Sequence, residues 1–149
     1  MNIESDYRKK LIRRLVELAV EAKVGGRRYI FQNELDALIA KKHEKGLRED
    51  RARARGEAGV AKVRNRVIQQ LNEMDIAAGR PLLTSLIVDG VKMYPPTNYF
   101  AVLAIRDRIL LKTRGEDSER LVELHRAELE RALEVNWRNV HAEVFKENL

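Results

Sequence analysis

Four arginines stand close together near the middle of the chain, and they are the residues best suited to bind a polyanion. They are Arg48, Arg51, Arg53 and Arg55. Residues 41–66 carry ten basic and four acidic side chains, and the resulting +6 equals the formal net charge of the whole chain. Guanidinium groups pair well with phosphate oxygens, so this cluster predicts contacts with a nucleic-acid backbone. The alternative is a solvated loop with local ion pairs, each contributing only about 0–1 kcal/mol.

A second set of polar residues follows this cluster at helical spacing. Apolar residues recur from Val60 to Met74 at steps of three or four, which predicts a helix over 59–75. Its outward face carries Lys62, Asn65, Arg66, Gln69 and Glu73. Lysine pairs with phosphate, arginine with guanine, and asparagine or glutamine with adenine. We therefore expect a phosphate contact at Lys62. The expected base contacts are Asn65, Arg66 and Gln69. A plain solvent-facing helix side is the alternative.

The sequence offers little to support catalysis. Asp89 and Lys92 lie close together, as the acidic and basic groups of a magnesium-dependent nuclease can, but Asp89 is better explained by a turn. Asp107 is expected to pair with the arginines on either side of it. The sequence also lacks a Walker-type phosphate loop, a GxGxxG motif and a GxSxG motif. We predict a non-enzymatic protein without a cofactor, and a metal-dependent nuclease is the catalytic alternative.

Metal binding is not predicted either. The chain contains no cysteine, which excludes disulfides, cysteine-ligated zinc and thiol catalysis. The three histidines are His43, His125 and His141. They form neither an HxxxH nor an HExxH pair, so we expect ordinary surface or core-edge histidines.

The elements before residue 80 are predicted to be mainly helical. Apolar residues spaced from Tyr7 to Ala22 indicate an amphipathic helix that ends at Gly25-Gly26. Residues 27–31 fit a brief strand or an extended lead-in, and Asn33 can cap a short helix that ends near Gly46. The basic arm, residues 46–58, has almost nothing to place in a core. After the helix over 59–75, Gly79 is the expected stop.

The second half predicts a hairpin and two further helices. Residues 82–88 are rich in β-forming types, Asp89-Gly90 is a strong two-residue turn signal, and residues 91–94 would form the return strand. A helix, capped by Asn98, is favoured over a strand for 99–111. A last helix would run from Asp117 or Ser118 to about residue 146. Its apolar stripe is Leu121, Leu124, Leu129, Leu133, Trp137, Val140 and Val144. This stripe is expected to be core, or else a dimer seam.

The order of elements up to Tyr94 resembles that of a winged helix–turn–helix domain. The resemblance implies that the third helix enters a DNA major groove and that the hairpin, or wing, places Lys92 on the backbone. Two features depart from that family: the long charged connection before the third helix, and Glu73 on the proposed DNA face. Separately, Arg80–Val88 with Pro95 or Pro96 and Phe100 is similar to a segment of small uncharacterised bacterial and phage proteins, which implies no activity.

We therefore predict a mainly α fold with one β-hairpin (α+β). A winged-helix-like domain would span 1–115, and an amphipathic helix over 116–149 would pack on this domain or on a partner. The predicted partner is nucleic acid, with duplex DNA favoured over RNA, and the last helix could form a homodimer. The alternative is a protein-interaction module, such as an accessory or inhibitory subunit in a bacterial, archaeal or mobile-element system. No apolar run approaches the ~18 residues of a membrane span, and the first ten residues lack the apolar core of a secretion signal, so a cytoplasmic location is expected.

Overall fold

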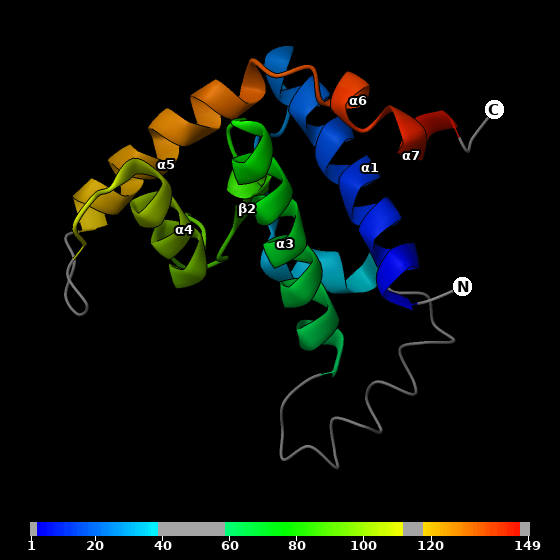
Figure 1. Ribbon diagram of the computed structural model, residues 1–149, viewed down its shortest axis with the longest axis horizontal. Helices are drawn as coiled ribbons and strands as arrows, with labels where there is room; N and C mark the ends of the chain where they lie inside the picture. Colours follow the sequence, from blue (N-terminus) through cyan, green and yellow to red (C-terminus); the bar gives the residue numbers. More distant parts are fainter. Residues whose placement is uncertain (1–2, 39–58, 112–117, 147–149) are drawn as a thin grey trace.

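The computed structural model describes residues 3–38, 59–111 and 118–146 of the chain, and most of these residues are helical (Figure 1). In order, the elements are α1 (Ile3–Lys23), β1 (Ile30–Phe31), the 3-10 helix η1 (Gln32–Leu38), α3 (Gly59–Ala78), the 3-10 helix η2 (Leu83–Leu86), β2 (Ile87–Val88), α4 (Thr97–Asp107), α5 (Ser118–Leu133), α6 (Trp137–Val140) and α7 (Ala142–Lys146). The mainly α prediction is confirmed. The predicted basic arm, with its four arginines, lies outside the described residues, and so does His43.

Helices α1 and α3 pack against each other, each through the apolar stripe that its sequence predicts. Tyr7 and Leu11 of α1 are fully buried, as is Val67 of α3, whereas Met74 at the end of the same stripe is exposed. The chain leaves α3 through Gly79, whose φ of 71° lies in the left-handed region that glycine adopts without steric cost. The predicted helix stop at this residue is confirmed.

The predicted β-hairpin is wrong. Strand β2 pairs in parallel with β1, with Ile30 opposite Ile87, and does not pair with residues 91–94. Residues 89–94 instead form a compact loop in which the backbone N–H of Asp89 donates to the carbonyl of Tyr94 over 2.9 Å. Val91 is 90% exposed, so a return strand here would have no apolar face to bury. The Asp-Gly signal thus marked a real turn but not a hairpin.

Helix α4 confirms the preference for a helix after the two prolines. It starts after Pro96, which occupies the N-cap position without a side-chain cap, so the predicted cap, Asn98, lies inside the first turn. It ends where Arg108 adopts a left-handed conformation with φ 56°. Tyr99, Phe100 and Leu103 of this helix form a second, smaller apolar cluster with Leu82.

The single long C-terminal helix predicted from Ser118 to about residue 146 is wrong, because the chain breaks between α5 and α6. The side chain of Asn136 accepts a hydrogen bond from the backbone N–H of Asn139 and so caps a new helix. The Trp137 indole N–H donates to the carbonyl of Ala132 over 2.7 Å, which turns the ring into the core. Leu129, Leu133 and Trp137 join the main apolar cluster with residues of α1 and α3. A homodimer through this stripe stays a prediction.

Candidate functional site

A cleft of about 600 Å³ opens between α3 and α4, and we call it the amide cleft. One wall is a stripe of α3 residues at helical spacing: Asn65, Ile68, Gln69 and Asn72. The facing wall comes from α4 and the turn before it: Pro95, Pro96, Asn98, Tyr99, Ala101 and Val102. Gln32, Thr84 and Ile87 complete the lining. Five of these residues carry side-chain amides, and none of the lining residues carries a formal charge at neutral pH.

Hydrogen bonds fix the orientation of two amides in the α3 wall, and the amide oxygen of a third, Asn65, accepts from Arg64 over 3.3 Å. The Oδ1 atom of Asn72 accepts from the Thr84 hydroxyl, which leaves the amide NH₂ as the remaining donor of this largely buried side chain. The Nε2 atom of Gln69 donates to Glu73 over 3.2 Å, which leaves the amide oxygen of Gln69 as an acceptor. Since positions 69 and 72 lie three residues apart, the wall presents a donor and an acceptor about one helical turn apart.

The predicted base contacts do not all lie together. Asn65 and Gln69 are exposed residues of the α3 wall, and both line the cleft. Arg66 turns instead toward α1, where its guanidinium donates to Glu4 over 2.9 Å. This hydrogen bond is the largest cause that lowers the pKa of Glu4, with a second contribution from Gln70. Arg66 therefore belongs to the α1–α3 seam, although 59% of its side chain is exposed.

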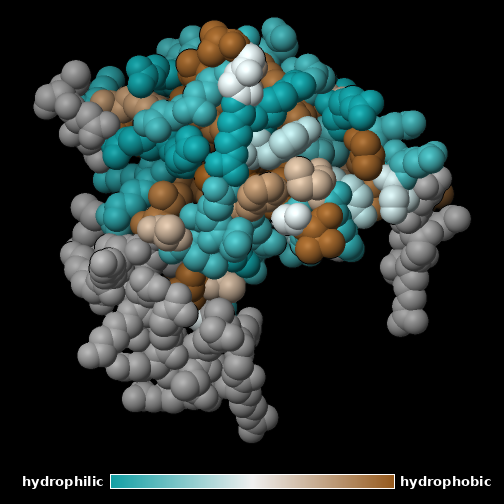
Figure 2. Space-filling model, turned by 180° about the vertical axis from the view of Figure 1, so that it is seen from behind, coloured by the Kyte–Doolittle hydropathy of each residue, from teal (hydrophilic) through white to brown (hydrophobic). Residues whose placement is uncertain are grey.

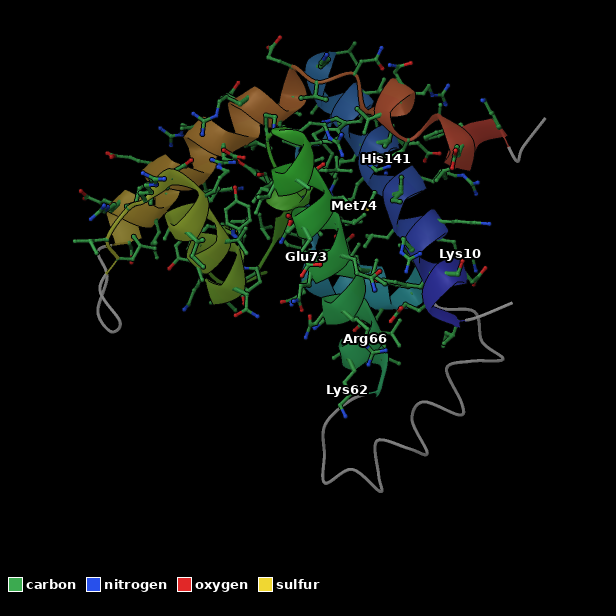
Figure 3. The ribbon with its side chains drawn as sticks, in the orientation of Figure 1. Lys10, Lys62, Arg66, Glu73, Met74 and His141 are labelled. Atoms are coloured by element: carbon green, nitrogen blue, oxygen red, sulfur yellow. The ribbon has the colours of Figure 1, made fainter. Side chains whose placement is uncertain are left out.

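The predicted phosphate contacts are described at two positions. Lys62 is exposed and points away from the body of the protein at the N-terminal end of α3 (Figure 3). Lys92 is exposed in the 89–94 loop, where its backbone N–H donates to the side chain of Asp89. Asp89 also accepts from the backbone of Val91, and these two bonds lower the pKa of its carboxyl, so Asp89 acts as a turn residue.

Arg64 has a structural role that its position in the sequence does not indicate. Its guanidinium donates to both carboxylate oxygens of Asp36, over 3.0 and 3.2 Å, and only 12% of its side chain is exposed. This pair joins α3 to η1. Within the described residues, part of the basic charge of α3 is thus used to hold the fold together.

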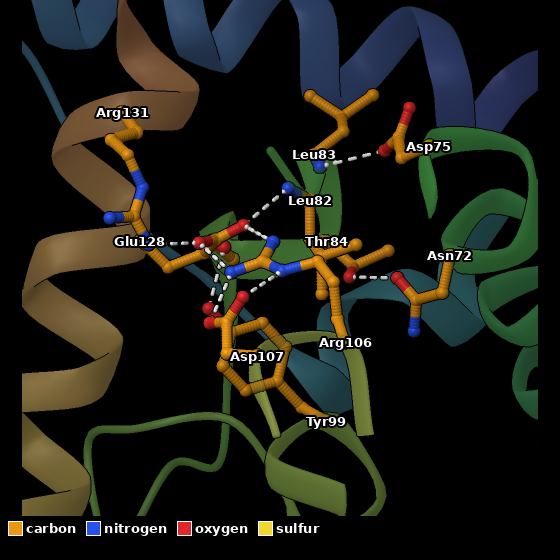
Figure 4. A network of polar contacts seen from close by, with 11 residues as sticks. Asn72, Asp75, Leu82, Leu83, Thr84, Tyr99, Arg106, Asp107, Glu128 and Arg131 are labelled. Carbon is orange, nitrogen blue, oxygen red and sulfur yellow. Dashed lines mark hydrogen bonds and ion pairs between the residues drawn. The ribbon is translucent and has the colours of Figure 1, made fainter. Parts of the chain in front are cut away.

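A buried network behind the cleft, which sequence analysis also missed, fixes α4 and α5 to η2 (Figure 4). Glu128 is fully buried, accepts from the backbone N–H of Leu82 over 2.8 Å, and pairs with Arg106 and Arg131. Burial alone would raise the pKa of Glu128, but hydrogen bonds from Arg106, Arg131 and Leu82 outweigh it and lower the pKa. Arg106 also pairs with Asp107, which confirms one of the two pairings predicted for this carboxylate.

A second carboxylate holds the neighbouring backbone group of the same segment. Asp75 of α3 accepts from the N–H of Leu83 over 3.0 Å and pairs with Arg80. Burial raises the pKa of Asp75 above its ordinary value. Together, two carboxylates from different helices thus hold consecutive N–H groups, and this fixes the segment that carries Thr84 into the cleft.

The two described histidines are core residues. His125 lies against the rings of Tyr29 and Tyr99, and its Nε2 atom is 2.7 Å from the carbonyl oxygen of Ser85. His141 stacks on Trp137. Burial lowers the pKa of both imidazoles. Within the described ranges, no three histidine, aspartate or glutamate side chains are grouped so that they could hold a metal ion.

Comparisons with protein-family models, with curated proteins and with solved structures found no match to this chain. In the part of the chain that the structure describes, none of the helices combines the length and the apolar character needed to cross a membrane.

Proposed function

We propose that this chain is a non-enzymatic nucleic-acid-binding protein that favours duplex DNA. Phosphates are met by the basic arm together with Lys62 and Lys92, and bases are contacted from the exposed face of α3. The phosphate contacts are Arg48, Arg51, Arg53, Arg55, Lys62 and Lys92. The base contacts are Asn65, Arg66 and Gln69.

The observation that carries this proposal is the placement of Lys62, Asn65 and Gln69. All three are exposed on one side of α3, and the helix continues directly from the most basic part of the sequence. In the sequence, the basic arm ends where the first turn of α3 begins, so its arginines directly precede this helix along the chain. This combination supplies cations for a backbone and amides for base edges.

Arg66 can take part only by exchanging partners. Its ion pair with Glu4 is partly exposed to solvent, and such pairs are worth about 0–1 kcal/mol. A phosphate or a guanine edge can compete with an interaction of that size. The role of Arg66 in the proposal is therefore a switch from Glu4 in the free protein to nucleic acid in the complex.

The winged-helix-like interpretation is retained only for the order α1, η1, α3, in which α3 acts as the recognition helix. Its wing is missing, since residues 91–94 do not form a strand. Lys92 keeps its proposed phosphate contact because it is exposed in the 89–94 loop. The proposal therefore depends on α3 and the basic arm more than on a second contact from a wing.

Salt dependence tests the proposal. Binding of a fluorescently labelled duplex is measured by anisotropy at a series of salt concentrations. About five neutralised phosphates predict a slope of log K against log salt of roughly −4 to −5. A flat plot, or the absence of binding at low salt, contradicts the proposal.

A protein partner is the second candidate, and exposed apolar side chains favour it. Ile105 of α4 is 81% exposed and Leu110 just beyond α4 is 90% exposed. On the face shown in Figure 2, hydrophilic residues predominate and apolar ones form small separate groups. Co-purification of one protein in stoichiometric amount would favour this candidate over the first, provided that Ile105→Lys releases that protein and the purified sample shows no nucleic-acid absorbance.

A further inference from the structure

We propose that the amide cleft binds a single unpaired nucleobase. This inference rests on the proposed function, because the base would belong to the nucleic acid whose phosphates contact the basic arm and the N-terminal end of α3. It goes beyond that function by placing one base inside the protein, between α3 and α4, instead of against the surface of α3.

The lining of the cleft restricts the charge of its ligand. A buried phosphate, carboxylate or ammonium group would lose its hydration without gaining an opposite charge from the lining residues, and that loss is costly. A pure hydrocarbon would leave the amide groups without hydrogen bonds, which is also unfavourable. The lining therefore favours an uncharged ligand that carries both donors and acceptors.

The two oriented amides narrow the choice further. Thr84 holds Asn72 so that its NH₂ group is the remaining donor, and Glu73 holds Gln69 so that its oxygen is the remaining acceptor. The Watson–Crick edge of each nucleobase carries at least one acceptor beside one donor, so it can satisfy both groups. Pro95, Pro96 and Val102 add apolar surface for the faces of a planar ring. A volume of about 600 Å³ lies within the usual range for small-ligand sites.

The position of the cleft fits a base that remains attached to its backbone. Lys62 and Asn65 are three residues apart on α3, so a phosphate near Lys62 would lie about one helical turn, roughly 5 Å, from the start of the amide stripe. The base would enter the cleft from a single-stranded end or a bulge, where no base pair must be broken.

The test uses 2-aminopurine, a fluorescent base, placed either in a one-nucleotide bulge or in a fully paired duplex. We expect the bulged duplex to bind about tenfold more tightly, with a change in 2-aminopurine fluorescence, as two additional hydrogen bonds would give. Ala101 lines the cleft and is exposed, so Ala101→Phe should fill the cleft and abolish the preference for the bulge, while binding of the paired duplex should keep the steep salt dependence that the basic residues give it. Ala127→Phe, at an exposed position of α5 outside the lining, is the matched control and should keep the preference.

The outcomes separate the two proposals. Salt-dependent binding of both duplexes without preference or fluorescence change overturns the nucleobase site and leaves the proposed function standing. If neither duplex binds, the proposed function fails, and NMR with adenosine alone then decides the inference. Shifts of the side-chain amide signals of Asn65, Gln69 and Asn72 that disappear in Ala101→Phe support the nucleobase site, and unchanged signals overturn it. Asn98→Ala is a second variant of the cleft lining for the same measurements. Asn98 is exposed, so its replacement should not disturb the core.

Discussion

Replacing Glu128 with glutamine should destabilise the fold more than any comparable surface change. Glu128→Gln keeps the shape of the side chain but removes the charge that pairs with Arg106 and Arg131. One of the two oxygens also becomes an NH₂ group, which faces the N–H donors that surround it. The backbone N–H of Leu82 can keep an acceptor, so the main loss comes from the guanidiniums.

The expected cost follows from the contacts. Arg106 donates to both oxygens of Glu128 over 2.6 and 2.7 Å, and Arg131 donates over 2.6 Å. The Oε1 atom accepts one bond from each arginine, so an NH₂ group in its place removes two charge-assisted hydrogen bonds of about 1.5 kcal/mol or more each, a cost of about 3 kcal/mol. For a chain of this size, about 2–4 °C per kcal/mol gives a fall in Tm of roughly 6–12 °C.

Thermal and urea unfolding followed by circular dichroism measure this cost directly. The matched control is Glu130→Gln on the same helix, because Glu130 is exposed and its ion pair with Arg28 is worth about 0–1 kcal/mol. If Glu128→Gln unfolds within about 0.5 kcal/mol of the wild type, the network does not stabilise the fold as argued.

Three further effects are expected. The pKa of Glu128 is lowered in the folded state, so the stability that its charge contributes is present above its ordinary pKa of 4.5 and is lost as the pH falls through the folded-state value. The unfolding curves of the wild type and Glu128→Gln should therefore converge in acid. A difference in stability that stays constant with pH would contradict this. Gly79→Ala should lower the free energy of unfolding in urea by about 1 kcal/mol, because a residue with a β-carbon is strained at φ 71°. Gly90→Ala should be nearly neutral, because the added carbon meets only Phe31 at 3.9 Å. Equal effects of the two substitutions would be inconsistent with Gly79 as the helix stop. Asn136→Ala should cost about 1 kcal/mol by removing the cap of α6, and Asn139→Ala should cost less; thermal unfolding that ranks them in the opposite order would show that the cap is not what ends α5.

The helices could be predicted from the sequence because their signals are local. The spacing of Tyr7, Leu11 and Leu15 defines the buried face of α1, and Gly79 marks the end of α3 without reference to any other element. Strand pairing is different, since Ile87 finds its partner in Ile30, far earlier in the chain. An Asp-Gly pair indicates that the chain turns, but it does not show which strand lies next to β2.

The C-terminal break and the candidate site show the same limit. The spacing around Trp137 is compatible with one continuous helix, and only the bonds made by Asn136 and by the indole N–H select the broken form. The period of α3 correctly places Lys62, Asn65 and Gln69 on an exposed face. It could not show that Arg66 reaches Glu4 on α1 or that α4 supplies the facing wall of the cleft, because both depend on packing between distant segments.

The proposal that the basic arm binds nucleic-acid phosphates is tested most directly by the salt dependence of duplex binding. The wild type is compared with a variant in which Arg48, Arg51, Arg53 and Arg55 are all replaced by glutamine. The wild type should lose affinity steeply with salt, and removing four phosphate contacts should make the log–log slope shallower by about 3 to 4. A wild-type slope near zero, or the same slope in both proteins, would show that the basic segment does not neutralise a nucleic-acid backbone.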